Sequence, residues 1–253
     1  MSHPSKSEKK IIIERFNHNV RGTRADVRSR NSQHDGNEGH WLEERMGISH
    51  NSNNAPDFTW FEMKNHTSTK TSFGDWSASY YVFRDKKYSI NRERFMEIFG
   101  QYNSTKKRFS WSGMPIPKIN TYNHFGQILV VNKSQDIDIF YSFTQDKRPE
   151  KASLVPQFFQ KEDLLIVQWN HEWMKRKVED KFNKAGWFKC KKNSEGVYNE
   201  IVFGGPLNYQ TFLEGVEKGV IFFDSGMHQG NSRNYSQWRA DNRLWDSMIT
   251  EKH

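Results

Sequence analysis

Two acidic residues and a lysine lie close together in the segment Pro56-Asp57-Phe58-Thr59-Trp60-Phe61-Glu62-Met63-Lys64. In an extended strand, residues two apart point to the same face, so Glu62 and Lys64 project together while the apolar residues beside them turn into the core. A bend in the turn-forming stretch 51–56 can swing the Asp57 carboxylate back beside Glu62. The segment can therefore gather two carboxylates and one ammonium group around a divalent cation.

This combination suits the hydrolysis of a phosphodiester bond. Carboxylate oxygens are hard ligands that suit Mg²⁺, which keeps several waters and accepts a substrate phosphate oxygen. We predict Asp57 and Glu62 as metal ligands, and Lys64 as the group that holds the nucleophile or steadies the charge of the pentacovalent state. An isolated pattern of this kind also fits ordinary charges at the edge of a strand. The other motifs of the chain are therefore needed to support the catalytic interpretation.

A third acid, Glu43, lies in Gly39-His40-Trp41-Leu42-Glu43-Glu44-Arg45-Met46-Gly47. Trp41, Leu42 and Met46 mark one side of a short helix, and Gly47 is a natural helix end. Glu43 is one residue removed from this apolar stripe. Its carboxylate can therefore point along the helix toward the predicted catalytic cleft that holds Asp57 and Glu62. We therefore include it among the predicted catalytic residues.

The late segment from His228 to Arg243 predicts a DNA-reading loop. It is dense in guanidinium and planar amide groups, which form paired hydrogen bonds with base edges and are costly to bury unpaired. A hydrophilic surface loop is the alternative. The residues predicted to contact DNA here are His228, Arg233, Gln237, Arg239 and Arg243.

The polar stretch 65–75 follows the predicted catalytic strand and is rich in Thr and Ser. Its hydroxyl groups and Lys70 can contact the DNA backbone near the scissile phosphate. A polar turn without a ligand explains the same composition equally well.

Composition agrees with a nucleic-acid partner. The chain has 253 residues, of which 34% are hydrophobic and 15% aromatic, enough to bury a core in one large domain or two lobes. Its formal charge of +8 suggests a polyanion, because lysines and arginines along phosphates release condensed counterions. Cys190 is the only cysteine, which excludes an internal disulfide and a cysteine zinc cluster. No apolar run suits a membrane span and no secretory signal is visible, so we expect a cytoplasmic protein of a bacterial cell.

Hydrophobic periodicity predicts an opening helix at 9–20, with Ile11, Ile12, Ile13 and Phe16 as its buried face. A second helix is predicted at 91–100. Alternating segments predict strands at 107–112, 126–132 and 136–144 in an antiparallel meander, and a buried strand at 164–169. A helix at 172–185 is expected to stop at Gly186 and to present a charged, solvated face that includes Lys177 and Lys181.

Taken together, these motifs resemble the MvaI/BcnI group of type II restriction endonucleases, relatives of the mismatch-repair nicking enzyme MutH among the PD-(D/E)xK nucleases. The likeness rests on Gly39 to Glu43, on Pro56-Asp57 and on Glu62-Met63-Lys64. A helix, an apolar strand and a basic tail over 212–243 match the late part of that family. The family's His-Asp-x-Gly pattern is absent before the last arginine, so base-reading residues do not transfer directly.

The resemblance implies an α/β (α+β) fold of the PD-(D/E)xK type: a mixed central sheet flanked by helices, in two lobes that form a DNA-binding cleft. It implies one bilobal domain over 1–253, with a catalytic core at about 36–75 and a recognition loop at about 225–245. Asp57, Glu62 and Lys64 match the family's catalytic triad, and Glu43 matches its helix acid.

The implied activity is Mg²⁺-dependent cleavage of both strands of double-stranded DNA at a short specific sequence, leaving 5′-phosphate ends. A monomer and a cognate DNA methyltransferase are also implied.

Three alternatives stay open on the residues alone. A MutH-like enzyme would nick one strand and need partner proteins. A non-catalytic, sequence-specific DNA-binding protein would use the acid cluster only structurally. A His-Asn-His nuclease is suggested by Asn65-His66 and Asn170-His171, but a second histidine in a suitable context is missing.

Overall fold

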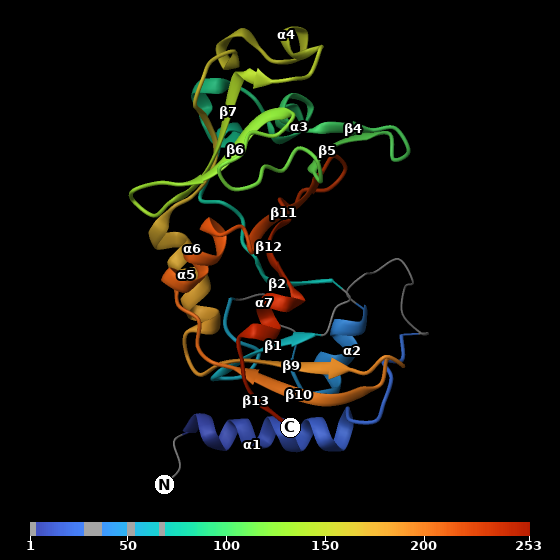
Figure 1. Cartoon of the computed structure of the whole chain (residues 1–253). Helices are drawn as coiled ribbons and strands as arrows, with labels where there is room; N and C mark the ends of the chain where they lie inside the picture. The colour runs from blue at the N-terminus through green and yellow to red at the C-terminus, as the bar shows by residue number, and fades with distance from the viewer. Residues whose placement is uncertain (1–3, 28–36, 50–53, 66–68) are drawn as a thin grey trace. The chain divides into compact units, whose positions relative to one another are not determined.

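The computed structural model describes residues 4–27, 37–49, 54–65 and 69–253 (Figure 1). The turn predicted at 51–56 and the polar stretch 65–75 lie partly outside these residues. The chain divides into two compact units that are each assembled from separate stretches of sequence. Unit 1 comprises residues 1–71, 177–208 and 241–253, and unit 2 comprises residues 72–176 and 209–240.

A mixed four-stranded sheet forms the centre of unit 1. Its strand order is β1-β9-β10-β13, with β1 and β9 parallel and the other neighbours antiparallel. This confirms the mixed sheet flanked by helices expected for this fold class. The elements of the unit are α1 (Pro4–Asn19), α2 (Asn37–Arg45), β1 (Phe61–Asn65), β9 (Gly186–Lys192), β10 (Tyr198–Gly204), α7 (Asn242–Ser247) and β13 (Ile249–Lys252).

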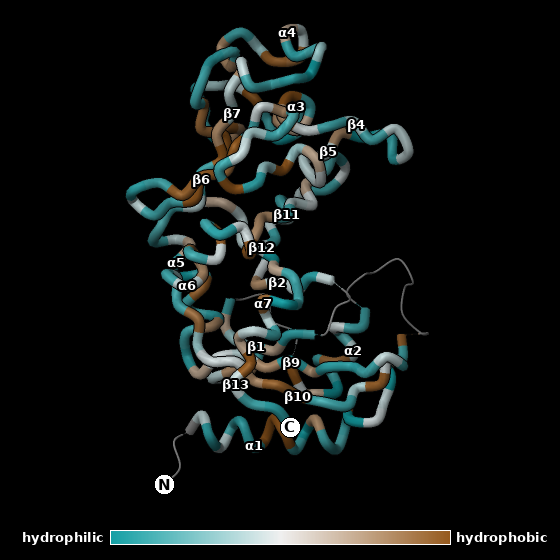
Figure 2. Tube along the Cα trace, viewed as in Figure 1, coloured by the Kyte–Doolittle hydropathy of each residue, from teal (hydrophilic) through white to brown (hydrophobic). Residues whose placement is uncertain are grey.

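The helices α1 and α2 cover one face of this sheet, and α7 lies on the other (Figure 1). Ile12 and Phe16 of α1 and Trp41 of α2 join a buried cluster with Phe61 and Phe188 of the sheet. Figure 2 shows the hydrophobic stretch in the middle of α1 and those of β9 and β10. This cluster therefore occupies the side of the sheet that faces α1.

Gly186 begins β9 in a conformation that favours glycine. Its φ is +121°, and a Cβ at this position would lie 2.2 Å from the carbonyl oxygen of Gly204 on β10. Only a residue without a side chain allows the two strands to approach so closely. Gly186 thus starts the strand that pairs with β1.

Unit 2 contains two sheets. One has the order β2-β12-β11-β5-β4, and the other, antiparallel throughout, has the order β3-β8-β7-β6. The strands are β2 (Lys70–Asp75), β3 (Tyr80–Tyr81), β4 (Gln101–Asn103), β5 (Arg108–Ser112), β6 (Phe125–Val131), β7 (Ile137–Asp146), β8 (Leu164–Trp169), β11 (Ile221–His228) and β12 (Ser236–Asp241). The helices are α3 (Arg92–Phe99), α4 (Lys151–Leu154) and α6 (Tyr209–Glu217), with 3₁₀ turns at 82–84, 86–88 and 157–159. Helix α5 (His171–Phe182) begins in unit 2, and its last six residues, 177–182, belong to unit 1.

Aromatic side chains join the two sheets of unit 2. Trp169 of β8 lies 4.7 Å from Phe223 of β11 and 5.1 Å from Trp238 of β12, measured between ring centroids. Trp238 is fully buried, so it packs the core and does not reach toward a ligand. Large buried rings such as these contribute heavily to the stability of a core.

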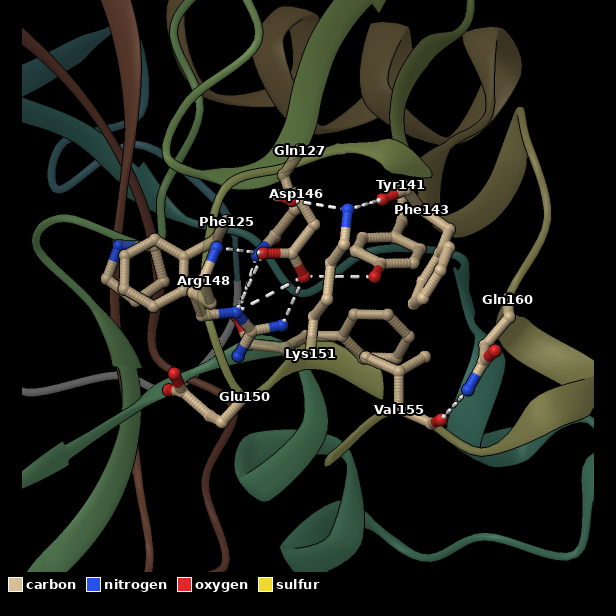
Figure 3. Close-up of polar contacts among 12 residues, drawn as sticks. Phe125, Gln127, Tyr141, Phe143, Asp146, Arg148, Glu150, Lys151, Val155 and Gln160 are labelled. Carbon is tan, nitrogen blue, oxygen red and sulfur yellow. Dashed lines mark hydrogen bonds and ion pairs between the residues drawn. The ribbon is translucent and has the colours of Figure 1, made fainter. Parts of the chain in front are cut away.

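A buried ion pair fixes the end of β7 (Figure 3). The Arg148 guanidinium donates to Asp146 at 2.7 Å and 3.0 Å, and the Tyr141 hydroxyl donates to the same carboxylate at 2.9 Å. Lys151 donates to the backbone oxygens of Phe143 and Asp146, both at 2.7 Å. Because these bonds satisfy the buried Asp146 carboxylate, we assign the cluster a structural role.

Most of the predicted elements are confirmed, with informative exceptions. Ile11 was expected to be buried but is 45% exposed. β5 pairs with β4 and β11, so it does not form the predicted meander with β6 and β7. The helix expected to reach Gly186 ends at Phe182. No helix among the described residues is both long and apolar enough to cross a membrane.

Candidate active site

The strand β1 places Glu62 and Lys64 together on the face of the sheet opposite α1. Phe61 and Met63 belong to the buried cluster that α1 covers, as the alternation of the segment predicts. Glu62 is only 2% exposed and Lys64 only 8%. Both charged groups are therefore held in a largely dry environment.

Asp57 lies beside this pair although it precedes the strand. The amide of Phe58 donates to the carbonyl oxygen of Phe61 at 3.0 Å and closes a tight bend. Beyond the bend, the amide of Met63 donates to Oδ2 of Asp57 at 2.9 Å. The predicted approach of Asp57 to Glu62 is thus present.

Two lysines contact one oxygen of Glu62. Nζ of Lys64 lies 2.8 Å from Oε1, and Nζ of Lys181 lies 3.0 Å from the same atom. The prediction that Lys181 belongs to a solvated helix face is wrong, because its side chain is 17% exposed and reaches the carboxylate of Glu62. Its spacing on α5 resembles that of any surface lysine, so only the tertiary fold reveals it.

The titration behaviour of the site reflects burial and crowding of like charges. Burial, followed by the nearby charge of Glu62, raises the pKa of Asp57 to about 7. Burial lowers the pKa of Lys64, although Glu62 opposes this shift. Two carboxylates held this closely favour a cation between them.

One buried oxygen of Glu62 has no hydrogen-bond partner. This atom, Oε2, is the sole carboxylate oxygen in that condition among the described side chains. An unsatisfied buried carboxylate oxygen is costly unless a ligand completes it. With Asp57 adjacent, the donor set fits a hard divalent cation that keeps most of its waters.

Glu43 is held differently. Its Oε2 lies 3.3 Å from Nδ1 of His40, one turn earlier on α2. Within the described part of the chain, no three His, Cys, Asp or Glu side chains gather as a metal site. Glu43 therefore does not join Asp57 and Glu62 around one point, and its assisting role stays a prediction.

A further lysine on the same face was missed from the sequence. Lys189 of β9 stands in register with Lys64 and is 1% exposed. Its Nζ contacts Oδ1 of Asn242 at 3.0 Å and Oγ1 of Thr71 at 3.5 Å, both neutral groups. Burial lowers the pKa of Lys189 to about 8. Had the segment 186–192 been recognised as a strand, the alternation of its side chains could have predicted which face of the sheet Lys189 occupies.

The loop predicted from His228 to Arg243 is wrong for most of its DNA-contacting residues: His228 ends β11, Gln237 and Arg239 lie on β12, and Arg243 lies in α7, which leaves Arg233 in the connection between the strands. Gln237 and Arg239 alternate on β12 with the buried Trp238 and Ala240, so both face outward. Arg239 donates to Gln237 at 2.7 Å through Nε and pairs with Asp224 of β11 at 3.2 Å. These groups line an open pocket of about 260 Å³ together with Ser225, Gly226 and Tyr235.

Arg92 organises the connection between β11 and β12. Its guanidinium donates to the backbone oxygens of Asn231 at 2.7 Å and Arg233 at 2.9 Å, and to Oδ1 of Asn234 at 2.9 Å. The Arg92 side chain is 14% exposed. No local pattern predicts this role for Arg92, because it starts α3, far from the connection along the chain.

The other residues predicted to contact DNA differ in their exposure and in their partners. His228 contacts the backbone oxygen of Gln229 at 2.7 Å, and Arg233, 63% exposed, pairs with Asp75 at 2.7 Å. Arg243 is 93% exposed and pairs with Asp241 at 3.1 Å. Lys70 begins β2 and is partly exposed.

Known restriction endonucleases match this protein along nearly its whole chain. The model of the family described as LlaMI restriction endonuclease matches residues 20–253. The type II restriction enzyme ScrFI of Lactococcus lactis subsp. cremoris is 46% identical, over 97% of this chain and 98% of that protein. Restriction endonuclease MvaI in complex with its cognate DNA superimposes with a TM-score of 0.62, covering 100% of this chain and 98% of that chain at 14% identity. The last likeness concerns the fold alone.

Proposed function

Because the chain belongs to the LlaMI restriction endonuclease family and is a type II restriction endonuclease, we propose that it cleaves both strands of double-stranded DNA at a short specific sequence and leaves 5′-phosphate ends. The observation that carries this proposal is the half-buried Asp57 beside the buried Glu62, with one Glu62 oxygen unsatisfied and Lys64 alongside. A site of two carboxylates and an ammonium group suits phosphodiester hydrolysis.

Asp57 and Glu62 are the residues proposed to hold Mg²⁺. A divalent cation bound there would make a water molecule more acidic and offset charge on the phosphate. The hydrogen bond from Met63 to Asp57 fixes the orientation of that carboxylate before any ligand arrives. Lys64, held 2.8 Å from Glu62, is proposed to steady the negative charge that develops on the phosphate oxygens. Glu43 is proposed to assist from α2.

The proposed DNA contacts fall into two kinds. Gln237 and Arg239 carry side chains that can read base edges, an amide for adenine and a guanidinium for guanine. Their outward direction on β12 supports this role. Side chains suited to phosphate contacts are those of Lys70, His228, Arg233 and Arg243, which position DNA without reading its sequence.

Digestion of unmethylated phage DNA tests the proposal. The purified protein is incubated with Mg²⁺ or with EDTA, and the fragment ends are mapped by sequencing. We expect discrete, Mg²⁺-dependent fragments that share one short sequence at their ends. Nicked circles without linear product would favour a strand-nicking enzyme, and intact but bound DNA would favour a binding protein. Glu62→Gln should bind the mapped sequence and fail to cut it.

A further inference from the structure

Lys181 brings a second ammonium group to the Glu62 carboxylate. It is the penultimate residue of α5, and its Nζ lies 3.0 Å from Oε1 of Glu62. Nζ of Lys64 approaches the same oxygen at 2.8 Å. Both lysines therefore converge on one oxygen, while Oε2 is buried and has no hydrogen-bond partner.

The charges of this cluster balance only without a further cation. Asp57 and Glu62 carry two negative charges when ionised, and Lys64 and Lys181 carry two positive charges. A divalent cation held by the carboxylates would lie within a few ångströms of both ammonium groups, where repulsion between positive charges is strong. Binding of the cation therefore favours the departure of one lysine from Glu62.

Lys181 is the lysine that is able to leave. Lys64 stands two residues from Glu62 on β1, and its side chain is 10% exposed. Both lysines have the same four-carbon chain, but Lys181 reaches the carboxylate from the last turn of a separate element, α5, and its side chain is 17% exposed. A released ammonium group beside a bound cation would need a new anion, and the substrate phosphate supplies one.

On the basis of the proposed function, we propose that Lys181 is a further active-site residue, which holds Glu62 in the DNA-free protein and turns to the scissile phosphate when the cation and DNA bind. In the DNA-free protein, the ammonium group of Lys181 thus supplies the positive charge beside Glu62 that the cation supplies later. A purely structural ion pair would contribute to stability and would leave cation affinity and cleavage unchanged.

Binding of Mn²⁺ to the whole DNA-free protein gives a direct test, because Mn²⁺ accepts the same oxygen ligands as Mg²⁺. Free Mn²⁺ is measured by electron paramagnetic resonance. Removing the competing charge in Lys181→Met should tighten Mn²⁺ binding roughly tenfold. Lys184→Met is the matched control, since Lys184 is exposed just beyond α5 and should bind Mn²⁺ like the unaltered protein.

Cleavage at saturating Mg²⁺ supplies the second measurement. Lys181→Met should cleave at least about tenfold more slowly although it binds the cation more tightly, because a phosphate contact is lost. Lys181→Arg should restore most of both properties, and thermal melting checks that each variant folds. Equal Mn²⁺ affinity of Lys181→Met and the unaltered protein would overturn the inference, as would an undiminished cleavage rate.

The proposed function fails in a different way. If the unaltered protein binds no Mn²⁺, or if Glu62→Gln binds it equally well, the cation site itself is refuted along with the inference that rests on it. If the unaltered protein binds Mn²⁺ through Glu62 but Lys181→Met does not bind it more tightly, only the role of Lys181 is refuted.

Discussion

The backbone amide of Met63 donates a hydrogen bond to Oδ2 of Asp57 at 2.9 Å. This bond joins the first acid of the motif to the strand that carries the second. It explains how Asp57 takes its place beside Glu62 although a bend separates them. The position of Asp57 and its charge can therefore be tested separately, by substitutions that change one and keep the other.

The first prediction concerns the charge of Asp57. Asp57→Asn keeps an oxygen that can accept the Met63 hydrogen bond, but it removes the negative charge. Because a proposed cation ligand is weakened, the cleavage rate should fall at least about a hundredfold. The melting temperature should not fall, because repulsion with Glu62 is relieved. Initial cleavage rates and thermal melts measure both effects. A rate within threefold, about the scatter of such assays, contradicts the assignment.

The second prediction concerns the pH dependence of stability through Lys189. Burial lowers the pKa of Lys189 from 10.5 to about 8. Below pH 8 this lysine is charged in both states, and burying the charge costs stability. Between pH 8 and 10.5 the folded protein releases the proton while the unfolded chain keeps it, so the cost fades.

Lys189→Met should therefore raise the free energy of unfolding at pH 7 by about 1–3 kcal/mol. This gain over the unaltered protein should shrink as the pH rises from 8 to 10.5. Urea unfolding across that range measures the difference, with Lys184→Met as the exposed control. A gain that is constant with pH would show that the charge of Lys189 is not its cause.

The third prediction concerns sequence reading by Arg239. Arg239→Lys keeps the positive charge but loses the planar fork that can bond one base twice. Affinity for the mapped cleavage sequence should fall by about 1–3 kcal/mol, while affinity for a scrambled duplex should hardly change. Fluorescence anisotropy without Mg²⁺ measures both. Equal losses on the two duplexes would indicate a phosphate contact in place of base reading.

The fourth prediction concerns the connection between β11 and β12. Arg92→Met removes the hydrogen bonds to Asn231, Arg233 and Asn234. The connection should then open more often, because it loses the bonds that hold two of its backbone oxygens and the Asn234 side chain, while the Arg233–Asp75 ion pair remains. Trypsin should cleave after Arg233 at least several times faster than in the unaltered protein, as followed by mass spectrometry. Unchanged cleavage there would mean that other contacts suffice.

The fifth prediction concerns the buried ion pair of unit 2. Arg148→Met leaves the Asp146 carboxylate buried without its cation, which should cost about 3–5 kcal/mol of unfolding free energy. The double variant Arg148→Met with Asp146→Leu should regain much of that loss, because both charges are gone. Chemical denaturation of the unaltered protein, of Arg148→Met and Asp146→Leu separately, and of the double variant measures the coupling. Additive losses would show that the pair does not act as a unit.

Local patterns allowed the centre of the site to be predicted. Glu62 and Lys64 alternate with buried residues inside one strand, and a bend suffices to add Asp57. These positions depend on patterns within a few residues, so they can be predicted without knowledge of the rest of the fold. The caps of α3 are equally local, since Asn91 accepts a hydrogen bond from the amide of Arg94.

Lys181 and Lys189 escaped prediction because they join the site from distant parts of the chain. The parallel pairing of β1 with β9 sets Lys64 opposite Lys189, and no turn between the strands encodes that register. Lys181 has the helical spacing of any solvent-exposed lysine. The segment after 235 was predicted as a loop because its polar residues dominate the composition, although Trp238 and Ala240 follow the alternation of a strand.

The chain passes between the two units at 71/72, 176/177, 208/209 and 240/241. Asp57 and Glu62 belong to unit 1, whereas Gln237 and Arg239 belong to unit 2. A single crossover between two related genes therefore cannot exchange one whole unit while leaving the other unaltered. If Gln237 and Arg239 read the target as proposed, we expect new target sequences to arise by point substitution on β11 and β12, because no whole-unit exchange can transfer target choice alone.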